Sequence, residues 1–128
     1  MLAICAVLIT NIAMAQPAEW KEMKAFHSVM SKSFHPSEEG NLQPLKDNAA
    51  DLVTKAKAWK AAAIPAGYNK ALTEKTLVNL VTKCEGIKTA VDGKKGDEDL
   101  KKLIAEAHEV FHQIVEKCSN PEHEGEKH

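Results

Sequence analysis

Apolar residues recur along most of the chain at spacings of three and four, which is the period of an amphipathic helix. In residues 18–34 the repeat falls on Trp20, Met23, His27, Met30 and Phe34. In residues 42–64 it falls on Leu45, Ala49, Leu52, Val53, Ala56 and Trp59. In residues 69–91 it falls on Leu77, Leu80, Cys84, Ile87 and Val91. The pattern therefore predicts three helices that each turn one face toward a shared core.

A fourth helix is predicted over residues 97–118, where the apolar face is wider. One seam comprises Ile104, His108, Phe111, Val115 and Cys118, and the adjacent seam comprises Leu100, Leu103, Ala107, Val110 and Ile114. Asp97 is expected to be the N-cap, with further acidic residues near the positive end of the helix. Four helices of this length with short connections predict an all-α protein, an antiparallel up-down-up-down four-helix bundle.

The connections contain the residues that end helices. Pro36 and Gly40 in "HPSEEGN" (35–41) are expected to break the first helix before the next begins. Asn41 is the predicted N-cap of the second helix, and Pro65 is expected to stop it. The segment "DGKKG" (92–96) predicts the last connection.

The two ends of the chain differ from the rest. "MLAICAVLITNIAMA" (1–15) carries no charge and ends in the small-x-small pattern that signal peptidase recognises. We therefore predict a secretory signal peptide, cleaved before Gln16, and a periplasmic or secreted protein; an unusually apolar first helix is the alternative. The bundle is then residues 16–118, and the polar tail (119–128) is expected to be disordered.

Composition excludes several classes of function. The length of 128 residues suits one domain, and the low aromatic content of 5% favours helices over a β-sandwich. A net charge of −1 does not indicate a nucleic-acid partner. No apolar run reaches the roughly 20 residues of a membrane span. No nucleophile elbow, phosphate loop or metalloprotease motif is present, and a lone Glu109-x-x-His112 does not make a di-iron site, so we predict no enzymatic activity.

The loops of an antiparallel bundle fix which residues lie at the same level. Taking the loops near 37–38, 66 and 94–95, we expect His27, Cys84 and the stretch around His108 to share one layer. His112 then lies one turn further along the fourth helix, near the level of Met23. Cys118 falls near residue 71, roughly 18–20 Å from Cys84 at the helical rise per residue.

That separation disfavours a disulfide between the two cysteines of the mature chain, because disulfides need Cα atoms within about 7 Å. An oxidising compartment favours a disulfide between Cys84 and Cys118. Two free thiols, a bond between chains and an intramolecular bond therefore stay open as alternatives.

Histidines on predicted core positions indicate a transition-metal site. His27, His108 and His112 are the predicted ligands, because bundles build such sites from side chains on facing helices. Cys84 and Met23 are expected to be supporting donors. Imidazole suits zinc, copper and nickel, and the sequence does not identify the metal. The alternative is that these are ordinary histidines bonded to their neighbours.

His35, with Glu38 and Glu39 beside it, is a further candidate ligand in the connection between the first two helices. A helix end followed by a turn rich in acidic residues explains the same segment without a metal.

The segments "PLKDNAADLVTKAKAWKAAA" (44–63) and "HEVFHQ" (108–113), together with the length of the bundle, resemble the periplasmic b-type cytochromes and the cytochromes c prime. In the b-type family a methionine of the first helix and a histidine near the end of the fourth ligate haem iron. The resemblance therefore implies the four-helix fold and a non-covalent haem b held by Met23 and His112.

The chain departs from both families. Ile104, Ala107 and His108 stand where cytochromes c prime carry Cys-x-x-Cys-His, so covalent haem attachment is excluded. His108 also replaces an arginine common in the b-type family, and the chain contains no arginine.

The leading hypothesis is a secreted or periplasmic bundle that binds a transition metal ion for binding, storage, transfer or sensing, without catalysis. The first alternative is a haem b electron-transfer protein, and the second is a cofactor-free helical interaction protein. The oligomeric state stays open, and an additional apolar stripe is compatible with a homodimer.

Overall fold

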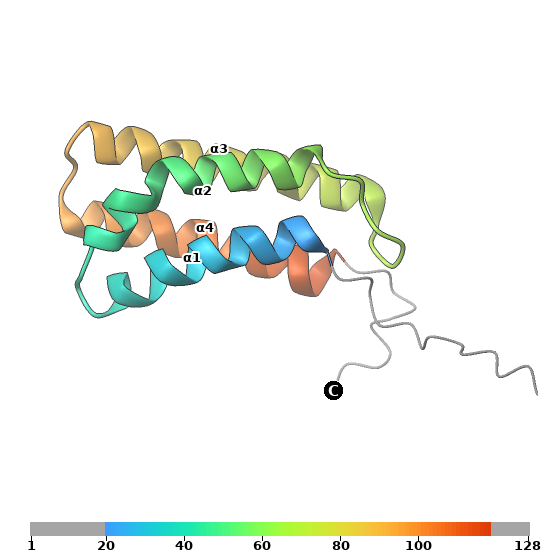
Figure 1. Ribbon diagram of the computed structural model, residues 1–128, viewed down its shortest axis with the longest axis horizontal. Helices are drawn as coiled ribbons and strands as arrows, with labels where there is room; N and C mark the ends of the chain where they lie inside the picture. Colours follow the sequence, from blue (N-terminus) through green and yellow to red (C-terminus); the bar gives the residue numbers. More distant parts are fainter. Residues whose placement is uncertain (1–19, 119–128) are drawn as a thin grey trace, which may run out of the picture.

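The computed structural model describes residues 20–118, and this part of the chain forms α-helices and no strand (Figure 1). The helices are α1 (Lys21–Glu38), α2 (Gln43–Ala61), α3 (Lys70–Asp92) and α4 (Asp97–Lys117). The predicted signal peptide (1–15) and polar tail (119–128) lie outside the described residues. Over residues 20–118, no helix is both long and apolar enough to cross a membrane.

Each helix packs against the next one along the chain, and α1 also packs against α4. The α1–α2 and α3–α4 connections lie at one end of the molecule, and the α2–α3 connection lies at the other (Figure 1). The predicted all-helical, four-helix fold is confirmed. The backbones of α1 and α4 approach each other less extensively than those of the other neighbouring pairs.

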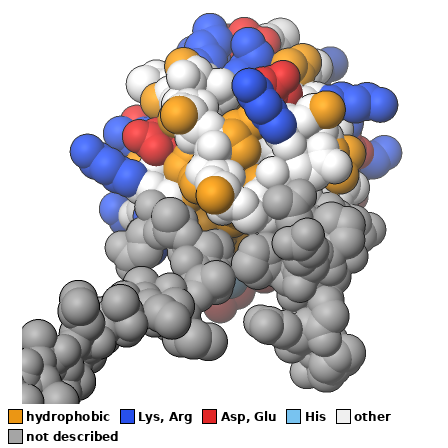
Figure 2. Space-filling view, turned by 90° about the vertical axis from the view of Figure 1, so that its right-hand side faces the viewer, with side chains coloured by type: hydrophobic (Ala, Val, Ile, Leu, Met, Phe, Trp, Pro, Cys, Tyr) orange, Lys and Arg blue, Asp and Glu red, His pale blue; other side chains and the backbone are white. Residues whose placement is uncertain are grey.

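The apolar faces predicted for α2, α3 and α4 form the core. Leu45, Leu52 and Trp59 of α2 are fully buried, as are Leu80 and Cys84 of α3. The rings of Trp20, Phe26, Trp59 and Phe111 fill one part of the interior. At the end of the bundle that carries the α2–α3 connection, apolar side chains occupy the middle of the visible face and charged ones its rim (Figure 2).

The core face of α1 differs from the prediction. The buried residues of this helix are Phe26, Val29, Met30, Ser33 and Ser37, whereas His27 is exposed and Phe34 is half-buried. Two serines take core positions because their hydroxyls are satisfied within the helix. Ser33 donates to the Val29 carbonyl at 2.9 Å, and Ser37 donates to the Phe34 carbonyl at 2.5 Å.

The predicted helix break at Pro36 is wrong, because α1 continues through Pro36 to Glu38. Pro36 lies in the last turn of α1, and the helix ends two residues after it, at Glu38. The end comes at Gly40, whose φ of +89° suits glycine. The N–H of Asn41 donates to the Pro36 carbonyl and that of Gly40 to the Ser37 carbonyl, which is the Schellman pattern.

The other helix ends lie close to the predicted ones. Leu42, and not the predicted Asn41, is the N-cap of α2, although the Asn41 side chain accepts a hydrogen bond from the Gln43 N–H at 3.2 Å. The Asn69 side chain caps α3 by accepting from the Leu72 N–H at 3.0 Å. Gly96, and not Asp97, is the N-cap of α4, so Asp97 is its first residue.

Because α1 is longer than predicted, different residues of α1 lie level with those of α4. The α1–α2 connection lies at residues 39–42 and not at 37–38. As a result Phe34 lies against His108, while His27 lies against Phe111. His27 therefore lies level with Phe111, which is three residues or about one helical turn from His108 on α4, and its side chain is exposed.

Candidate metal site

His108 and His112 form a pair on α4, at the side of the helix that faces α1. Their Nε2 atoms are 3.2 Å apart, their ring centroids are 4.4 Å apart, and the two ring planes are nearly perpendicular at 80°. The spacing of four residues places both side chains on the same helix face. One nitrogen of each imidazole therefore lies beside a nitrogen of the other.

This separation suits a shared metal ion. Two nitrogens that ligate one tetrahedral zinc ion at 2.0–2.1 Å lie about 3.3 Å apart. The observed Nε2–Nε2 distance of 3.2 Å is close to that value. Without a metal, the same contact is a hydrogen bond in which one Nε2–H donates to the other nitrogen.

Two neighbours orient the pair. His112 Nδ1 lies 2.8 Å from Glu116 Oε2, so Nδ1–H donates to the carboxylate and Nε2 keeps its lone pair. A carboxylate on the far nitrogen is the usual partner of a metal-bound histidine. Phe34 stacks on His108 with centroids 3.8 Å apart and an angle of 7° between the planes. This contact from α1 fixes the His108 ring.

The surroundings of His108 favour its neutral form. Burial lowers the pKa of His108 below its ordinary value of 6.5, and the neighbouring His112 and the more distant His35 lower it further. Glu38 and Glu109 act in the opposite direction. A neutral imidazole is the form that binds metal, so His108 is available as a ligand at neutral pH.

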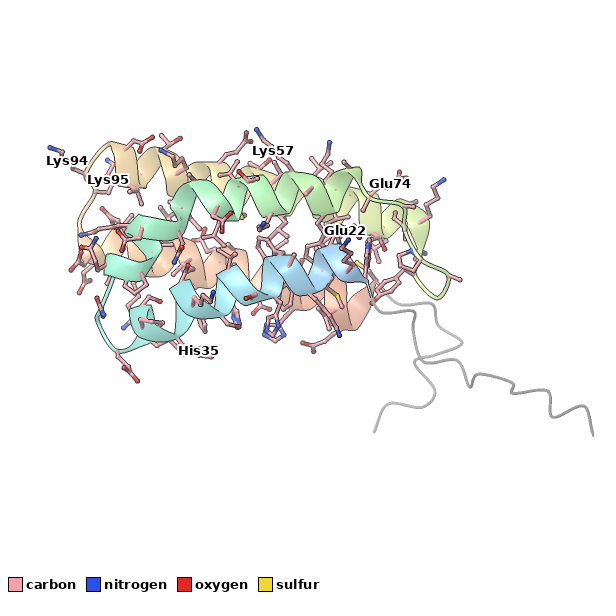
Figure 3. All side chains as sticks on the ribbon, in the orientation of Figure 1. Glu22, His35, Lys57, Glu74, Lys94 and Lys95 are labelled. Atoms are coloured by element: carbon pink, nitrogen blue, oxygen red, sulfur yellow. The ribbon has the colours of Figure 1, made fainter. Side chains whose placement is uncertain are left out.

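The other predicted ligands lie apart from this pair. His35 is on the last turn of α1, with 70% of its side chain exposed and its Nδ1 3.8 Å from Glu38 Oε1 (Figure 3). His27 is exposed and stacks on Phe111, with ring centroids 5.1 Å apart. Over residues 20–118, no three His, Cys, Asp or Glu side chains are grouped closely enough to hold a metal ion. The structure thus brings together two of the five predicted ligands.

Cys84 has no exposed surface, and burial, with Glu85 adding to the effect, raises the pKa of its thiol to about 12. Cys84 is not grouped with the histidine pair, so we leave it out of the candidate site. Cys84 and Cys118 are both free and buried. Cys118 donates to Thr76 Oγ1 at 3.6 Å, and its carbonyl accepts from the Asn69 N–H, close to the predicted level at residue 71.

The residues around Met23 and His112 do not fit a haem. Met23 is half-buried and packs against the core. The neighbouring interior is occupied by aromatic rings in mutual contact, since Phe26 lies 5.6 Å from Trp59 and 5.9 Å from Phe111 between centroids. A macrocycle would have to displace these buried rings.

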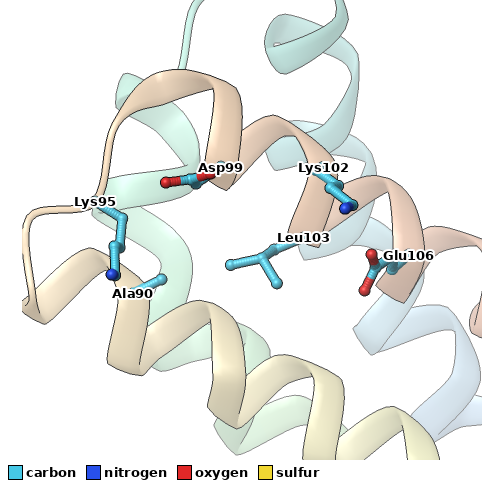
Figure 4. Close-up of a pocket in the computed structure, with 6 residues that line it drawn as sticks. All are labelled: Ala90, Lys95, Asp99, Lys102, Leu103 and Glu106. Atoms are coloured by element: carbon cyan, nitrogen blue, oxygen red, sulfur yellow. The ribbon is translucent and has the colours of Figure 1, made fainter.

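A separate groove of about 340 Å³ lies between the end of α3 and the start of α4 (Figure 4). Its walls carry both basic and acidic side chains, namely Lys95, Asp99, Lys102 and Glu106. The mixture of charges indicates no ligand class, and the groove shares no residue with the histidine pair.

Two contacts of the histidine pair were not predicted from the sequence. Glu116 follows His112 by four residues, so the helical spacing alone could have identified it as the partner of that histidine. Phe34 was placed on the core seam, but its stacking on His108 depends on the α1–α4 register, which the sequence did not give correctly.

Comparison with known proteins adds no relative: no protein family, no curated protein and no solved structure matches this chain. The resemblance to the b-type cytochromes and cytochromes c prime therefore rests on the sequence segments alone.

Proposed function

We propose that this protein is a secreted or periplasmic bundle that binds a transition metal ion at His108 and His112. In this proposal the helices follow the antiparallel up-down-up-down order, which the alternating positions of the connections in Figure 1 support. The role is binding, storage, transfer or sensing of the metal, without catalysis. The uncharged, apolar segment 1–15 supports the compartment.

The observation that carries the proposal is the 3.2 Å separation of the two Nε2 atoms. The Glu116 carboxylate supports it, because it holds His112 in the tautomer that presents Nε2. The lowered pKa of His108 supports it as well. Zinc, copper and nickel all accept imidazole ligands, and zinc fits the spacing in a tetrahedral geometry.

The test is zinc binding by protein without an affinity tag, measured by competition with a chromophoric chelator at pH 7.5. Replacing His112 with alanine removes one of two protein ligands and its carboxylate partner from the site. We expect His112→Ala to lower the zinc affinity by at least about tenfold, since even loss of an outer-sphere partner costs 10–100-fold.

His27→Ala is the matched control, because His27 also lies on the α1–α4 side of the bundle and is exposed. This variant should bind zinc as the unchanged protein does. If His112→Ala and the unchanged protein bind zinc equally well, the pair is not the metal site and the proposal fails.

A further inference from the structure

The histidine pair supplies two ligands, whereas zinc in closed protein sites takes four. Among residues 20–118, no third His, Cys, Asp or Glu is placed so that it could hold a metal ion together with them. We propose that a second copy of this chain supplies the missing pair, so that one zinc ion bridges two bundles through His108 and His112 of each. This inference rests on the proposed metal site.

The geometry of the pair suits such a shared ion. A tetrahedron has two opposite edges related by a two-fold axis, and each edge can be occupied by the nitrogens of one chain. The Nε2–Nε2 distance of 3.2 Å approximates the edge of about 3.3 Å that a tetrahedral zinc site needs. A two-fold axis through the ion uses the same surface on both chains, which is the commonest symmetry of homodimers.

The pair is also accessible to another chain. His112 leaves 44% of its side chain exposed, although its ring contacts His108 and Glu116. The ring of His108 is held from behind by Phe34, so its orientation survives the approach of a partner. Both histidines are only half-buried, so side chains of a second chain can reach the pair.

Charge favours the same arrangement. Four neutral imidazoles leave the full +2 charge on a zinc ion. One Glu116 carboxylate from each chain, bonded to His112 Nδ1, balances that charge across two copies. The net charge of −1 per chain means that repulsion between the copies is small.

Sedimentation velocity of the tag-free protein at increasing zinc tests this inference. We expect a monomer in chelator, a dimer that is most abundant at one zinc per two chains, and return to monomer when chelator is added. Excess zinc should also dissociate the dimer, because each pair then holds its own ion. His27→Ala should dimerise normally, and so should a variant with both His123 and His128 of the tail replaced by alanine.

Zinc bound to a chain that stays monomeric at all ratios would overturn the dimer while leaving the proposed metal site intact. Absence of zinc binding would overturn both. Zinc-dependent dimers that persist in His108→Ala or His112→Ala, or dimers that form in chelator, would also overturn the inference, since other residues would then join the copies.

Discussion

Replacing Trp59 with alanine is expected to lower the free energy of unfolding by about 3–5 kcal/mol, the usual cost of truncating a buried tryptophan. Trp59 has no exposed surface, and its ring contacts Trp20 at 5.5 Å, Phe26 at 5.6 Å and Phe111 at 5.9 Å between centroids. Truncation leaves a cavity that three helices border. Urea unfolding, followed by helical circular dichroism, measures the loss.

Leu72→Ala is the control, because Leu72 is also apolar and helical but leaves 42% of its surface exposed. Its effect should stay within about 0.5 kcal/mol, as for most surface substitutions. A loss below about 1 kcal/mol for Trp59→Ala would contradict the packing of the aromatic cluster.

Zinc affinity is expected to fall by about 10²–10³-fold between pH 7.5 and pH 5.0, because both imidazoles must lose their protons to bind the ion. A histidine of ordinary pKa, about 6.5, is mostly protonated at pH 5.0, and the protonated ring cannot bind a metal ion. The lowered pKa of His108 keeps that ring neutral further into acid, which places the fall toward the smaller end of the range. Chelator competition at each pH, corrected for protonation of the chelator, measures it.

The pH profile of His112→Ala provides the control, since only one imidazole then competes with protons and the slope should be shallower. A change below about threefold in the unchanged protein would exclude histidine ligation.

The lowered pKa of His108 also makes the folding stability depend on pH. The neutral His108 contributes stability above pH 6.5, and that contribution is lost as the pH falls through the folded-state pKa.

The sequence predicted the fold where apolar side chains alone decide which face is buried. The buried residues of α2 all lie on its predicted apolar face, and in α3 the predicted Leu77, Leu80, Cys84 and Ile87 are buried. In α1 the rule failed, because Ser33 and Ser37 occupy core positions with hydroxyls that bond to the helix's own carbonyls. Because the apolar pattern counts serine as polar, it predicts a buried face that is rotated by about a quarter turn around the helix axis. This rotation assigns His27 to the core.

The sequence predicts the part of the candidate site that lies within a single helix. His108 and His112 meet because four residues of helix place them together, and this spacing can be read from the sequence. Which residue of α1 contacts His108 depends on where that helix ends. Gly40 and not Pro36 ends it, and this difference placed Phe34 against His108 in place of His27.

Burial explains the remaining difference between the predicted and the candidate site. Cys84 was expected both in the core and as a donor; it is fully buried, which raises the pKa of its thiol, and it is not grouped with the histidine pair. His35 was expected in a loop and lies on the last turn of α1, with its side chain directed to solvent.

A crystal structure of the zinc-loaded protein, with anomalous data at the zinc edge, tests the proposed site most directly. We predict one strong peak about 2.0–2.1 Å from the Nε2 atoms of both His108 and His112. Glu116 should remain on His112 Nδ1 in that structure. A peak bound only to other residues, or none within bonding distance of these two nitrogens, would contradict the account.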